Sequence, residues 1–396
     1  MSNLALFQIR QALIELFLRD HGYDGLLITR PDNFAMATGG RRNYIWTYSD
    51  VGANAFFVTN TGQAYFVGNR IEQPRIMEEE LQEFGCGALA YNWWDGRAAD
   101  VVKQEFSGNL VSDDGSLGKN VHEELAVLRG LLTPVELEKY RVLGSYAAEA
   151  MVATLNQISA GTGEADIAAL LVAEGQKRHC QVPVALVAAD DRIAKYRHPL
   201  PTVTSLLPGE RQRSVEQYVM VVGCFLCEGL VVSMTRFKQV AEVLPDIEAS
   251  FARICGVDAL LQEASAPGQT LGDVFAACQK AYSDLGFDAD EWHNHHQGGV
   301  TGYAGRTKKG TPGESFPVLA SGWAERVREL SGIETSFGAA FAWNPSAPGV
   351  KSEDTFLLTA DGRREIISAT PSLPVVDLES VLGRPTEAVK SGMAVP

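Results

Sequence analysis

The chain has 396 residues, of which 45% are apolar and 21% charged, a globular composition too long for one ordinary core. Its formal net charge of −15 argues against a nucleic-acid-binding surface, which needs clustered lysine and arginine. No apolar stretch approaches the roughly 20 residues of a membrane span, and the start resembles an amphipathic helix rather than a signal peptide. We expect a cytoplasmic protein with no nucleic-acid or membrane partner, whose six cysteines are reduced thiols.

The first part of the chain alternates helix and strand patterns. Short β-type runs occur at residues 22–30, 54–60, 63–69 and 87–91. The second and third of these runs are joined by TNTGQ, which predicts a hairpin. Helical patterns occur at residues 1–17, 77–85, 101–108 and 121–132. These patterns predict a small α/β domain over residues 1–130.

A second domain, residues 131–396, is predicted to begin with a capped helix. Thr133 is the expected N-cap, Pro134 occupies the first helical position, and Glu136 completes a capping box. Thr270 and Asp273 form a second such box. Helices are predicted at 133–158, 161–178 and 270–286, and strand runs at 184–189, 218–237, 337–345 and 352–368. The fold class is therefore α/β (α+β), with the last twenty residues as an irregular tail.

The run 218–237 predicts a hairpin of two buried strands that turn at Cys-Glu-Gly. It carries Cys224 and Cys227 in a C-x-x-C spacing, but the chain has no second such pair. A zinc site is therefore not expected, and we interpret both residues as core thiols.

The segment WHNHHQGGVTGY (292–303) raises the question of a metal site, because it carries His293, His295 and His296. In a strand, the first two would share one face and the third would point to the other. The neighbouring sequence offers no identifiable acidic residue that could hold a metal together with His293 and His295. We therefore interpret two of the three histidines as structural or solvated. Gly298 and Gly299 would allow backbone to approach a ligand closely.

Four segments, taken in order, resemble the creatinase, prolidase and aminopeptidase P family, whose second domain has the "pita-bread" fold. RHPLPT (197–202) is similar to the family's His-before-Pro segment, and the hairpin ending in MTRF (234–237) to its strand pair ending in Thr-Arg. HHQGG (295–299) resembles its His-x-x-Gly segment, and NPSAPGVKSEDTFLLT (344–359) its final strands. The resemblance covers nearly the whole chain.

The resemblance implies a site for two divalent metals held by two Asp, one His and two Glu, which activate a bridging water. The family's positions fall here on Val222, Ser233, His296, Asn344 and Glu353. Only the histidine and one carboxylate remain. We therefore expect no metal and no other cofactor.

Creatinase itself is a family member that works without metal, and it uses a histidine as acid/base to cleave a C–N bond. Its histidine corresponds to His198, and an arginine that would clamp a substrate carboxylate corresponds to Arg306. The two carboxylates that bind creatine's guanidinium correspond to Thr235 and Asn344, so creatine is a poor candidate.

The remaining pocket offers the neutral polar groups of Ser233, Thr235 and Asn344 for substrate binding. Glu353 next to His296 is expected to set the tautomer of that histidine and to raise its pKa. A small zwitterionic or anionic substrate would fit such a set.

The family's dimers often let the N-terminal domain of one subunit reach the pocket of the other. The segment GGRRNYIWTYSD (39–50) is rich in donors and aromatics. We therefore expect a homodimer in which Arg41 or Arg42 contributes to the neighbouring pocket.

Three functions remain open. The first is a metal-independent, creatinase-like enzyme that hydrolyses, or eliminates across, a C–N-type bond of a small amino-acid-like substrate. His198 would be its acid/base, with His296 and Glu353 assisting and Arg306 anchoring a carboxylate. The second is an inactive pseudopeptidase that binds a ligand or protein. The third is a metal-dependent Xaa-Pro peptidase, which the missing ligands disfavour.

Overall fold

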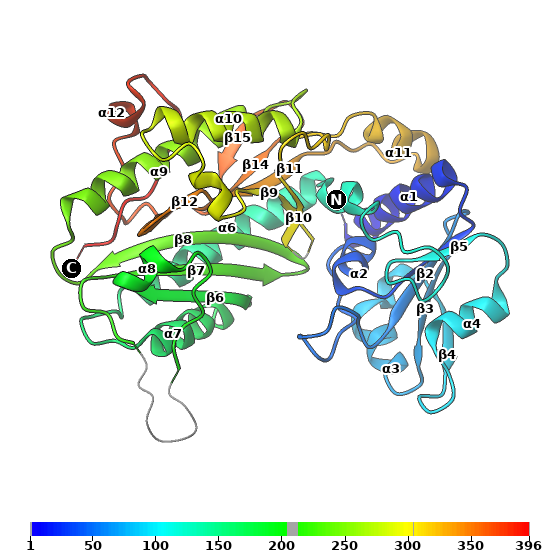
Figure 1. Cartoon of the computed structure of the whole chain (residues 1–396). Coiled ribbons are helices and arrows are strands. Elements are labelled where there is room, and N and C mark those ends of the chain that lie inside the picture. Colours follow the sequence, from blue (N-terminus) through cyan, green and yellow to red (C-terminus); the bar gives the residue numbers. More distant parts are fainter. Residues whose placement is uncertain (1, 204–212, 304, 396) are drawn as a thin grey trace.

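The computed structural model describes residues 2–203, 213–303 and 305–395. Its N-terminal part, blue to cyan in Figure 1, is built on a five-stranded sheet of order β4-β3-β2-β1-β5. The strands are β1 Gly25–Ile28, β2 Ala55–Thr59, β3 Ala64–Asn69, β4 Gly87–Tyr91 and β5 Leu110–Ser112. The helices are α1 Asn3–His21, α2 Pro31–Thr38, α3 Gln73–Arg75, α4 Ala98–Glu105 and α5 Ala126–Gly130.

This first sheet is mixed. β1, β2 and β3 pair antiparallel, so the predicted β2–β3 hairpin is confirmed. β4 and β5 pair parallel to β3 and β1. The helix predicted at 77–85 is instead a π turn, η1 Ile76–Glu80, followed by a 3-10 turn, η2 Gln82–Phe84.

The second part holds a three-stranded and a five-stranded sheet, with orders β6-β7-β8 and β10-β9-β11-β14-β15. The strands are β6 Gln181–Ala189, β7 Tyr218–Cys227, β8 Leu230–Gln239, β9 Gly298–Gly302, β10 Gly305–Lys309, β11 Ala339–Trp343, β14 Asp354–Leu358 and β15 Arg364–Ile366. The short strands β12 Ser346–Ala347 and β13 Val350–Lys351 pair with each other. The helices are α6 Pro134–Leu155, α7 Glu164–Gln176, α8 Asp191–Lys195, α9 Pro245–Ala264, α10 Leu271–Asp284, α11 Trp323–Ser331 and α12 Leu378–Leu382, with the 3-10 turn η3 Glu291–Asn294.

The local signals that predicted these elements are confirmed by their contacts. Thr133 and Glu136 form the capping box of α6, and Thr270 and Asp273 that of α10. The β7–β8 hairpin turns at Glu228 and Gly229, both with positive φ (46° and 76°), as a two-residue hairpin loop requires.

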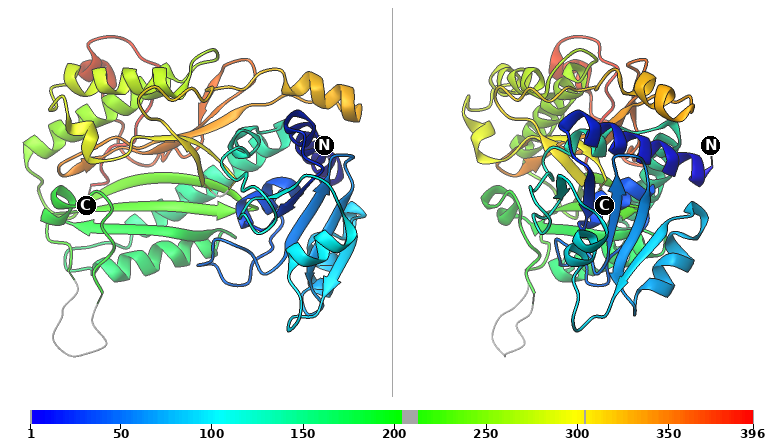
Figure 2. Two further views of the ribbon diagram at one scale, coloured as in Figure 1. Left: turned by 45° about the vertical axis from the view of Figure 1, so that its right-hand side comes forward. Right: turned by 90° about the vertical axis from the view of Figure 1, so that its right-hand side faces the viewer.

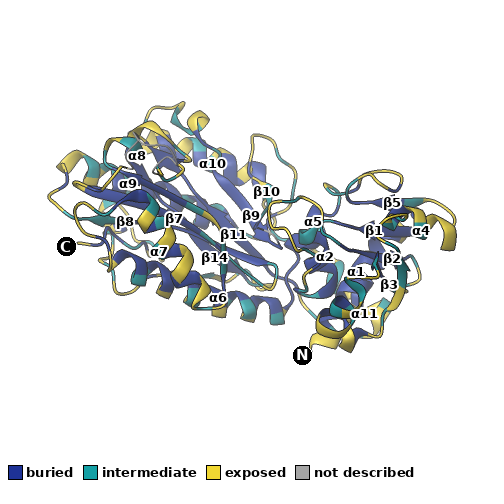
Figure 3. Ribbon diagram, turned by 90° about the horizontal axis from the view of Figure 1, so that it is seen from below, coloured by how far each residue is buried: buried dark blue, intermediate teal, exposed yellow. Residues whose placement is uncertain are grey.

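The helices lie on the outside of the second part, with α7 beside β6–β8 and α9 and α10 on the opposite side of the molecule (Figures 1 and 2). β7, β8, β9, β11 and β14 form the buried interior, dark blue in Figure 3. The predicted fold class is confirmed. In the described part of the chain, no helix is long and apolar enough to cross a membrane.

A buried ion pair connects the N-terminal part of the chain to the second part. Arg10 of α1 is fully buried and donates to Glu136 of α6 and to the carbonyl oxygens of Leu128 and Leu131. Tyr303 donates to the same carboxylate. The capping glutamate of α6 thus also fixes the first helix, because its second oxygen remains bound to Thr133.

The prediction of an irregular C-terminal tail is wrong, because the tail contains α12 and docks onto the second domain. Lys390 is 1% exposed and pairs with Asp258 of α9 and Asp354 of β14. Ala394 bridges to Lys238 of β8. The sequence gives little sign of this docking, because the charged partners lie 132 and 36 residues away.

We expect Lys390→Met to lower the free energy of unfolding by about 3–5 kcal/mol, because Asp258 would stay buried without its cation and Asp354 would keep only Arg236. Urea denaturation followed by circular dichroism measures the change. The control is Lys280→Met, which removes an exposed i,i+4 pair with Asp284 and should cost less than about 1 kcal/mol. Equal small losses in both variants would contradict the stabilising role of the buried pairs.

Candidate active site

The inner face of the β7–β8 hairpin forms one wall of the candidate site. Val222 pairs with Thr235 and Cys224 with Ser233, so these four side chains share one face of the sheet. The Cys224 Sγ lies 3.3 Å from the Ser233 Oγ. Burial raises the pKa of the Cys224 thiol to about 11, which agrees with the predicted core position, although this thiol also faces Ser233 in the wall of the site. All six cysteines are free.

Glu353 is the acid at the centre of the polar groups predicted from the sequence. It is 3% exposed and follows β13, directly before β14. Its Oε2 accepts from the Thr235 Oγ1 at 2.8 Å, and its Oε1 accepts from the Asn344 Nδ2 at 3.3 Å. The Arg306 Nη2 lies 3.4 Å from the same Oε1. The structure thus brings Thr235, Asn344, Arg306 and Glu353 together.

Three imidazole rings gather beside these groups. The Nε2 atoms of His198 and His295 are 3.0 Å apart, a hydrogen bond in which one nitrogen carries the proton. The ring centroids of His295 and His296 lie 4.4 Å apart, and those of His198 and His296 5.1 Å apart. His198 is exposed whereas His295 is buried, so the pair runs from solvent into the protein.

The sequence interpretation of this histidine run is wrong in one respect. The segment before β9 is the 3-10 turn η3, not a strand, so the strand alternation does not apply. His293 points to solvent with 56% of its side chain exposed, whereas His295 joins His198 and His296. The sequence reasoning therefore missed His295, which only the contact with the distant 197–202 segment identifies.

Two contacts hold the histidines in this arrangement. The Arg197 Nη2, next to His198, pairs with the Glu291 Oε1 of η3 at 2.6 Å. The buried Gln297 side chain donates to the backbone oxygen of His295 and accepts from the Tyr282 hydroxyl at 3.0 Å. These contacts tie the two histidine-bearing segments to each other and to α10.

Gly298 and Gly299, predicted to let backbone approach a ligand, instead allow close packing against neighbouring strands. Gly298 has φ 98°, and a Cβ there would meet the Ala342 backbone oxygen at 2.2 Å. A Cβ on Gly299 would meet the Lys308 backbone oxygen at 2.1 Å. The close approach is therefore to the flanking strands β11 and β10, not to a ligand.

All three imidazoles are held in the neutral form. Burial lowers the pKa of His296 to about 3, and the cations of Arg306 and Lys309 add to the effect. Burial also lowers the pKa of His295, followed by the charge of Lys351, and the same two causes lower the pKa of His198. Neutral imidazole accepts a proton at one nitrogen and donates at the other.

The expected Glu353–His296 pairing is wrong. The Glu353 carboxylate is bound by Thr235, Asn344 and Arg306, and the pKa of His296 is lowered rather than raised. The cations around the ring outweigh the one acid, since burial and Arg306 are the two largest influences on that pKa.

Lys351 is a second residue that the sequence reasoning missed. It is 3% exposed on β13, two residues before Glu353. Burial lowers its pKa, and the neighbouring Arg306 lowers it further, against the opposing charge of Glu353. The only sequence signal is its place in KSED, the segment that already carries Glu353.

Arg41 and Arg42, predicted to serve a neighbouring subunit, are bound within their own chain. Arg41 pairs with Glu83, and the Arg42 Nη2 lies 3.0 Å from the Glu80 Oε1. They line a cavity of about 330 Å³ against the tip of the β7–β8 hairpin. None of the three site histidines lines this cavity.

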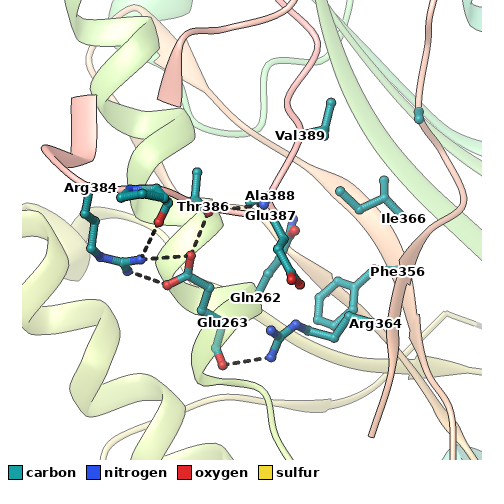
Figure 4. A pocket seen from close by; sticks show the side chains of 12 residues that line it. Gln262, Glu263, Phe356, Arg364, Ile366, Arg384, Thr386, Glu387, Ala388 and Val389 are labelled. Atoms are coloured by element: carbon teal, nitrogen blue, oxygen red, sulfur yellow. Dashed lines mark hydrogen bonds and ion pairs between the residues drawn. The ribbon is translucent and has the colours of Figure 1, made fainter. Parts of the chain in front are cut away.

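A separate cavity of about 770 Å³ lies between α9, β14–β15 and the C-terminal tail (Figure 4). Its Glu263 carboxylate accepts from Thr386 at 2.7 Å and pairs with Arg384, and its backbone oxygen accepts from Arg364 at 3.1 Å. None of the predicted site residues lines it. Its central acid, Glu263, is thus bound by three other lining residues.

Comparison with solved structures gives matches along the whole chain. Dipeptidase PepE from Mycobacterium ulcerans is 17% identical, with coverage of 100% of this chain and 99% of that one, at a TM-score of 0.69. A dipeptidase from Pyrococcus horikoshii OT3 is 13% identical, with coverage of 98% and 100%, at 0.70. The N-terminal domain of FACT complex subunit SPT16 from chickpea is 10% identical, with coverage of 96% and 99%, at 0.60.

This chain has the pita-bread fold. Prolidases and Xaa-Pro peptidases are among the further matches, so the resemblance drawn from the sequence is confirmed at the level of the fold. No protein-family model and no curated protein sequence matches the chain.

The residues at this site do not fit the two-metal centre that the resemblance implies. Of the five corresponding positions, Val222 has no ligand atom, and Ser233 and Asn344 offer only neutral oxygens. Arg306 and Lys351 lie close enough to Glu353 for their charges to act on one another. Two adjacent dications would meet a single acid with these basic side chains beside it, so the arrangement opposes them.

The three imidazoles alone could hold one ion, because their ligand atoms all lie within 4.8 Å of one another. Neutral imidazole is a good ligand for zinc and similar metals. The same cations that lower the histidine pKa values also oppose a dication here. The charge of the site therefore favours an anion over a metal ion.

The lowered pKa of His296 predicts acid sensitivity. The unfolded chain binds a proton on this group below about pH 6.5, whereas the folded chain does so only near pH 3. Its contribution to stability is therefore complete above about pH 6.5 and is lost progressively toward pH 3. Per pH unit in that window, one such group changes the free energy of unfolding by at most about 1.4 kcal/mol, and by less here because solvent screens the half-buried ring.

We expect His296→Asn to make stability fall less steeply between pH 6 and pH 5 than in the wild-type protein, as measured by urea denaturation at each pH. His293→Asn, whose side chain is exposed, is the control and should leave the slope unchanged. The same slope in all three proteins would contradict a neutral, half-buried His296.

Proposed function

We propose that the protein is a metal-independent, creatinase-like enzyme that hydrolyses a C–N-type bond of a small amino-acid-like substrate. The observation that carries this proposal is the contact of 3.0 Å between the Nε2 atoms of His198 and His295, beside a site whose cations do not suit metal ions. His198 would be the acid/base, with His295 as its partner, and His296 and Glu353 would assist.

The histidine pair would supply one acid/base group and the group that orients it. Of the two facing Nε2 atoms, one carries a proton and the other a lone pair, and they are hydrogen-bonded to each other at 3.0 Å. When a substrate and a water molecule displace this contact, the His198 Nε2 would accept a proton from the water as the water oxygen attacks the substrate carbon. The imidazolium formed in this way would then donate the same proton to the leaving nitrogen as the C–N bond breaks, which returns His198 to its neutral form.

The neutral polar groups would position the substrate. Glu353 is already held by Thr235 and Asn344, so it would act as a fixed hydrogen-bond acceptor and not as a second acid/base. The buried Asn344 Oδ1 has no hydrogen-bond partner among the described residues, so it would accept a hydrogen bond from a substrate N–H. Ser233 and Arg306 would complete the wall.

A pseudopeptidase that binds a ligand or protein is the second candidate. The lost carboxylates support it, and one similar structure is named as a subunit of the FACT complex, not as a peptidase. Turnover separates the two candidates, because both would bind a small molecule in the same pocket. A metal-dependent Xaa-Pro peptidase is the third and is opposed by the charges of the site.

We also propose that the enzyme is a cytoplasmic homodimer in which the N-terminal domain of one subunit approaches the pocket of the other. Arg41 and Arg42 are paired within their own chain, whereas Trp46 is 68% and Tyr48 90% exposed. The loop that carries them would therefore approach the neighbouring pocket with its aromatic side chains.

His198→Gln should reduce turnover by about 10²–10⁴-fold, the usual contribution of an acid/base group, with a smaller effect on KM. The assay screens N-carbamoyl, N-amidino and N-acyl amino acids by mass spectrometry and then determines kcat on the best substrate. His293→Gln, on the neighbouring exposed turn, is the control and should retain activity. A substrate that binds both variants equally and is never converted would favour the binding module.

Removal of metal should leave that activity unchanged. The protein is dialysed against a chelator, analysed by mass spectrometry for bound metal, and assayed with and without added Zn²⁺, Mn²⁺ or Co²⁺. Activity that disappears on chelation and returns in proportion to bound metal would overturn the metal-independent mechanism. One equivalent per chain would then point to the three imidazoles.

A further inference from the structure

Lys351 is an unpaired cation inside the candidate site. It is 3% exposed, and no carboxylate oxygen of the described residues lies within 4.0 Å of its ammonium group. The nearest acid in the sequence, Glu353, is bound by Thr235, Asn344 and Arg306. A charge removed from water is costly unless an opposite charge or hydrogen bonds compensate it.

Other deeply buried cations among the described residues are compensated, by carboxylates or, for Arg129, by hydrogen bonds to the Asn33 Oδ1 and the His122 backbone oxygen. Lys390 pairs with two carboxylates, and Arg236 pairs with Asp354 at 2.6 Å. Arg10 pairs with Glu136. Lys351 differs from these structural cations because, within the described residues, its partner is missing.

The charged groups near the three rings leave an excess of positive charge. Arg306, Lys309 and Lys351 are cations that act on the imidazoles, against the single acid Glu353. Arg306 is partly engaged, because its Nη2 lies 3.4 Å from Glu353 and 3.3 Å from the Ala342 backbone oxygen. A negative charge supplied from outside would reduce this excess, and Lys351 is the buried cation of the site that lacks a carboxylate partner among the described residues.

We propose that Lys351, rather than Arg306, is the main anchor for a carboxylate of the substrate, and that this substrate is a small acid whose nitrogen is uncharged, such as an N-carbamoyl or N-acyl amino acid. The inference rests on the proposed function, since it places this ligand in the same pocket. It makes Lys351 a substrate-binding residue and gives Arg306 the role of holding Glu353.

The uncharged nitrogen follows from the same charges. A free amino acid or peptide brings an α-ammonium group, which needs an acid to receive it. Glu353 is the one acid at the site and already has three partners. An ammonium group would also be repelled by Arg306 and Lys351, because like charges in a partly buried site interact strongly. A carbamoyl or acyl group removes this charge and offers an N–H and a carbonyl oxygen.

Binding tests this proposal without any need for turnover. The probes are N-carbamoylglycine, its neutral primary amide, and glycine, titrated into full-length protein at constant ionic strength. The ring signals of His198, His295 and His296 are followed by NMR, which also detects weak binding. We expect the wild-type protein to prefer the acid over the amide and over glycine.

Lys351→Met should weaken binding of the acid by about 10- to 100-fold, the effect of losing a hydrogen bond between charged groups, and leave binding of the amide nearly unchanged. Lys351→Arg should restore part of the preference. Lys308→Met is the matched control, because it removes the same charge from β10 at a lysine that pairs with Glu314. It should keep the preference for the acid, and circular dichroism verifies that each variant is folded.

Two results would overturn the proposal. One is a wild-type protein that shows no preference for the acid over its amide, including one that binds neither. The other is a preference that survives in Lys351→Met and is lost in Arg306→Gln, which would make Arg306 the anchor. A Lys351-dependent preference without any conversion of the probe would support the anchor while removing support for the enzyme, so the two proposals fail separately.

Discussion

The contact between β8 and the start of β14 is the constraint on which the second domain depends. Arg236 pairs with Asp354 at 2.6 Å, and the Thr235 backbone N–H donates to the Glu353 oxygen at 3.1 Å. This seam joins the three-stranded sheet to the five-stranded one. Lys390 of the C-terminal tail pairs with the other oxygen of Asp354. Because neighbouring side chains point in opposite directions along a strand, Asp354 binds Arg236 and Lys390 in the core, whereas Glu353 contacts the residues of the site.

The positions that correspond to metal ligands in the resembling family carry mostly neutral groups here, and this changes the net charge of the site. A two-metal site gathers carboxylates to hold positive charge. Here one carboxylate remains, and the positive charge is built into the chain as Arg306 and Lys351. The pita-bread fold can keep its shape through this exchange, because the seam uses Arg236, Asp354 and backbone groups rather than the metal. Under the proposed function, the site keeps cationic character while its chemistry would depend on imidazole.

The sequence predicted the fold from signals that act over short distances. The capping boxes at Thr133 and Thr270 and the turn at Glu228 and Gly229 each depend on residues within a few positions. Thr235 lies far from Asn344 and Glu353 in the sequence. Their contact is predicted only because all three correspond to site positions of the resembling family. His295 escaped prediction because its environment is set by His198, 97 residues away. The docking of the C-terminal tail also escaped prediction, because the partners of Lys390 are distant in the sequence. An isolated lysine in a polar segment normally indicates an exposed side chain.

The lowered pKa values of the histidines and the missing partner of Lys351 have one physical origin. Each buried cation near the rings makes protonated imidazole less stable, and each also raises the cost of leaving Lys351 unpaired. A bound carboxylate would reduce both costs at once. It would neutralise the excess charge and bring the histidine pKa values closer to neutrality, where an acid/base group works best. Substrate binding and proton transfer would then be coupled through charge alone, with the anion itself preparing the histidine pair for its reaction.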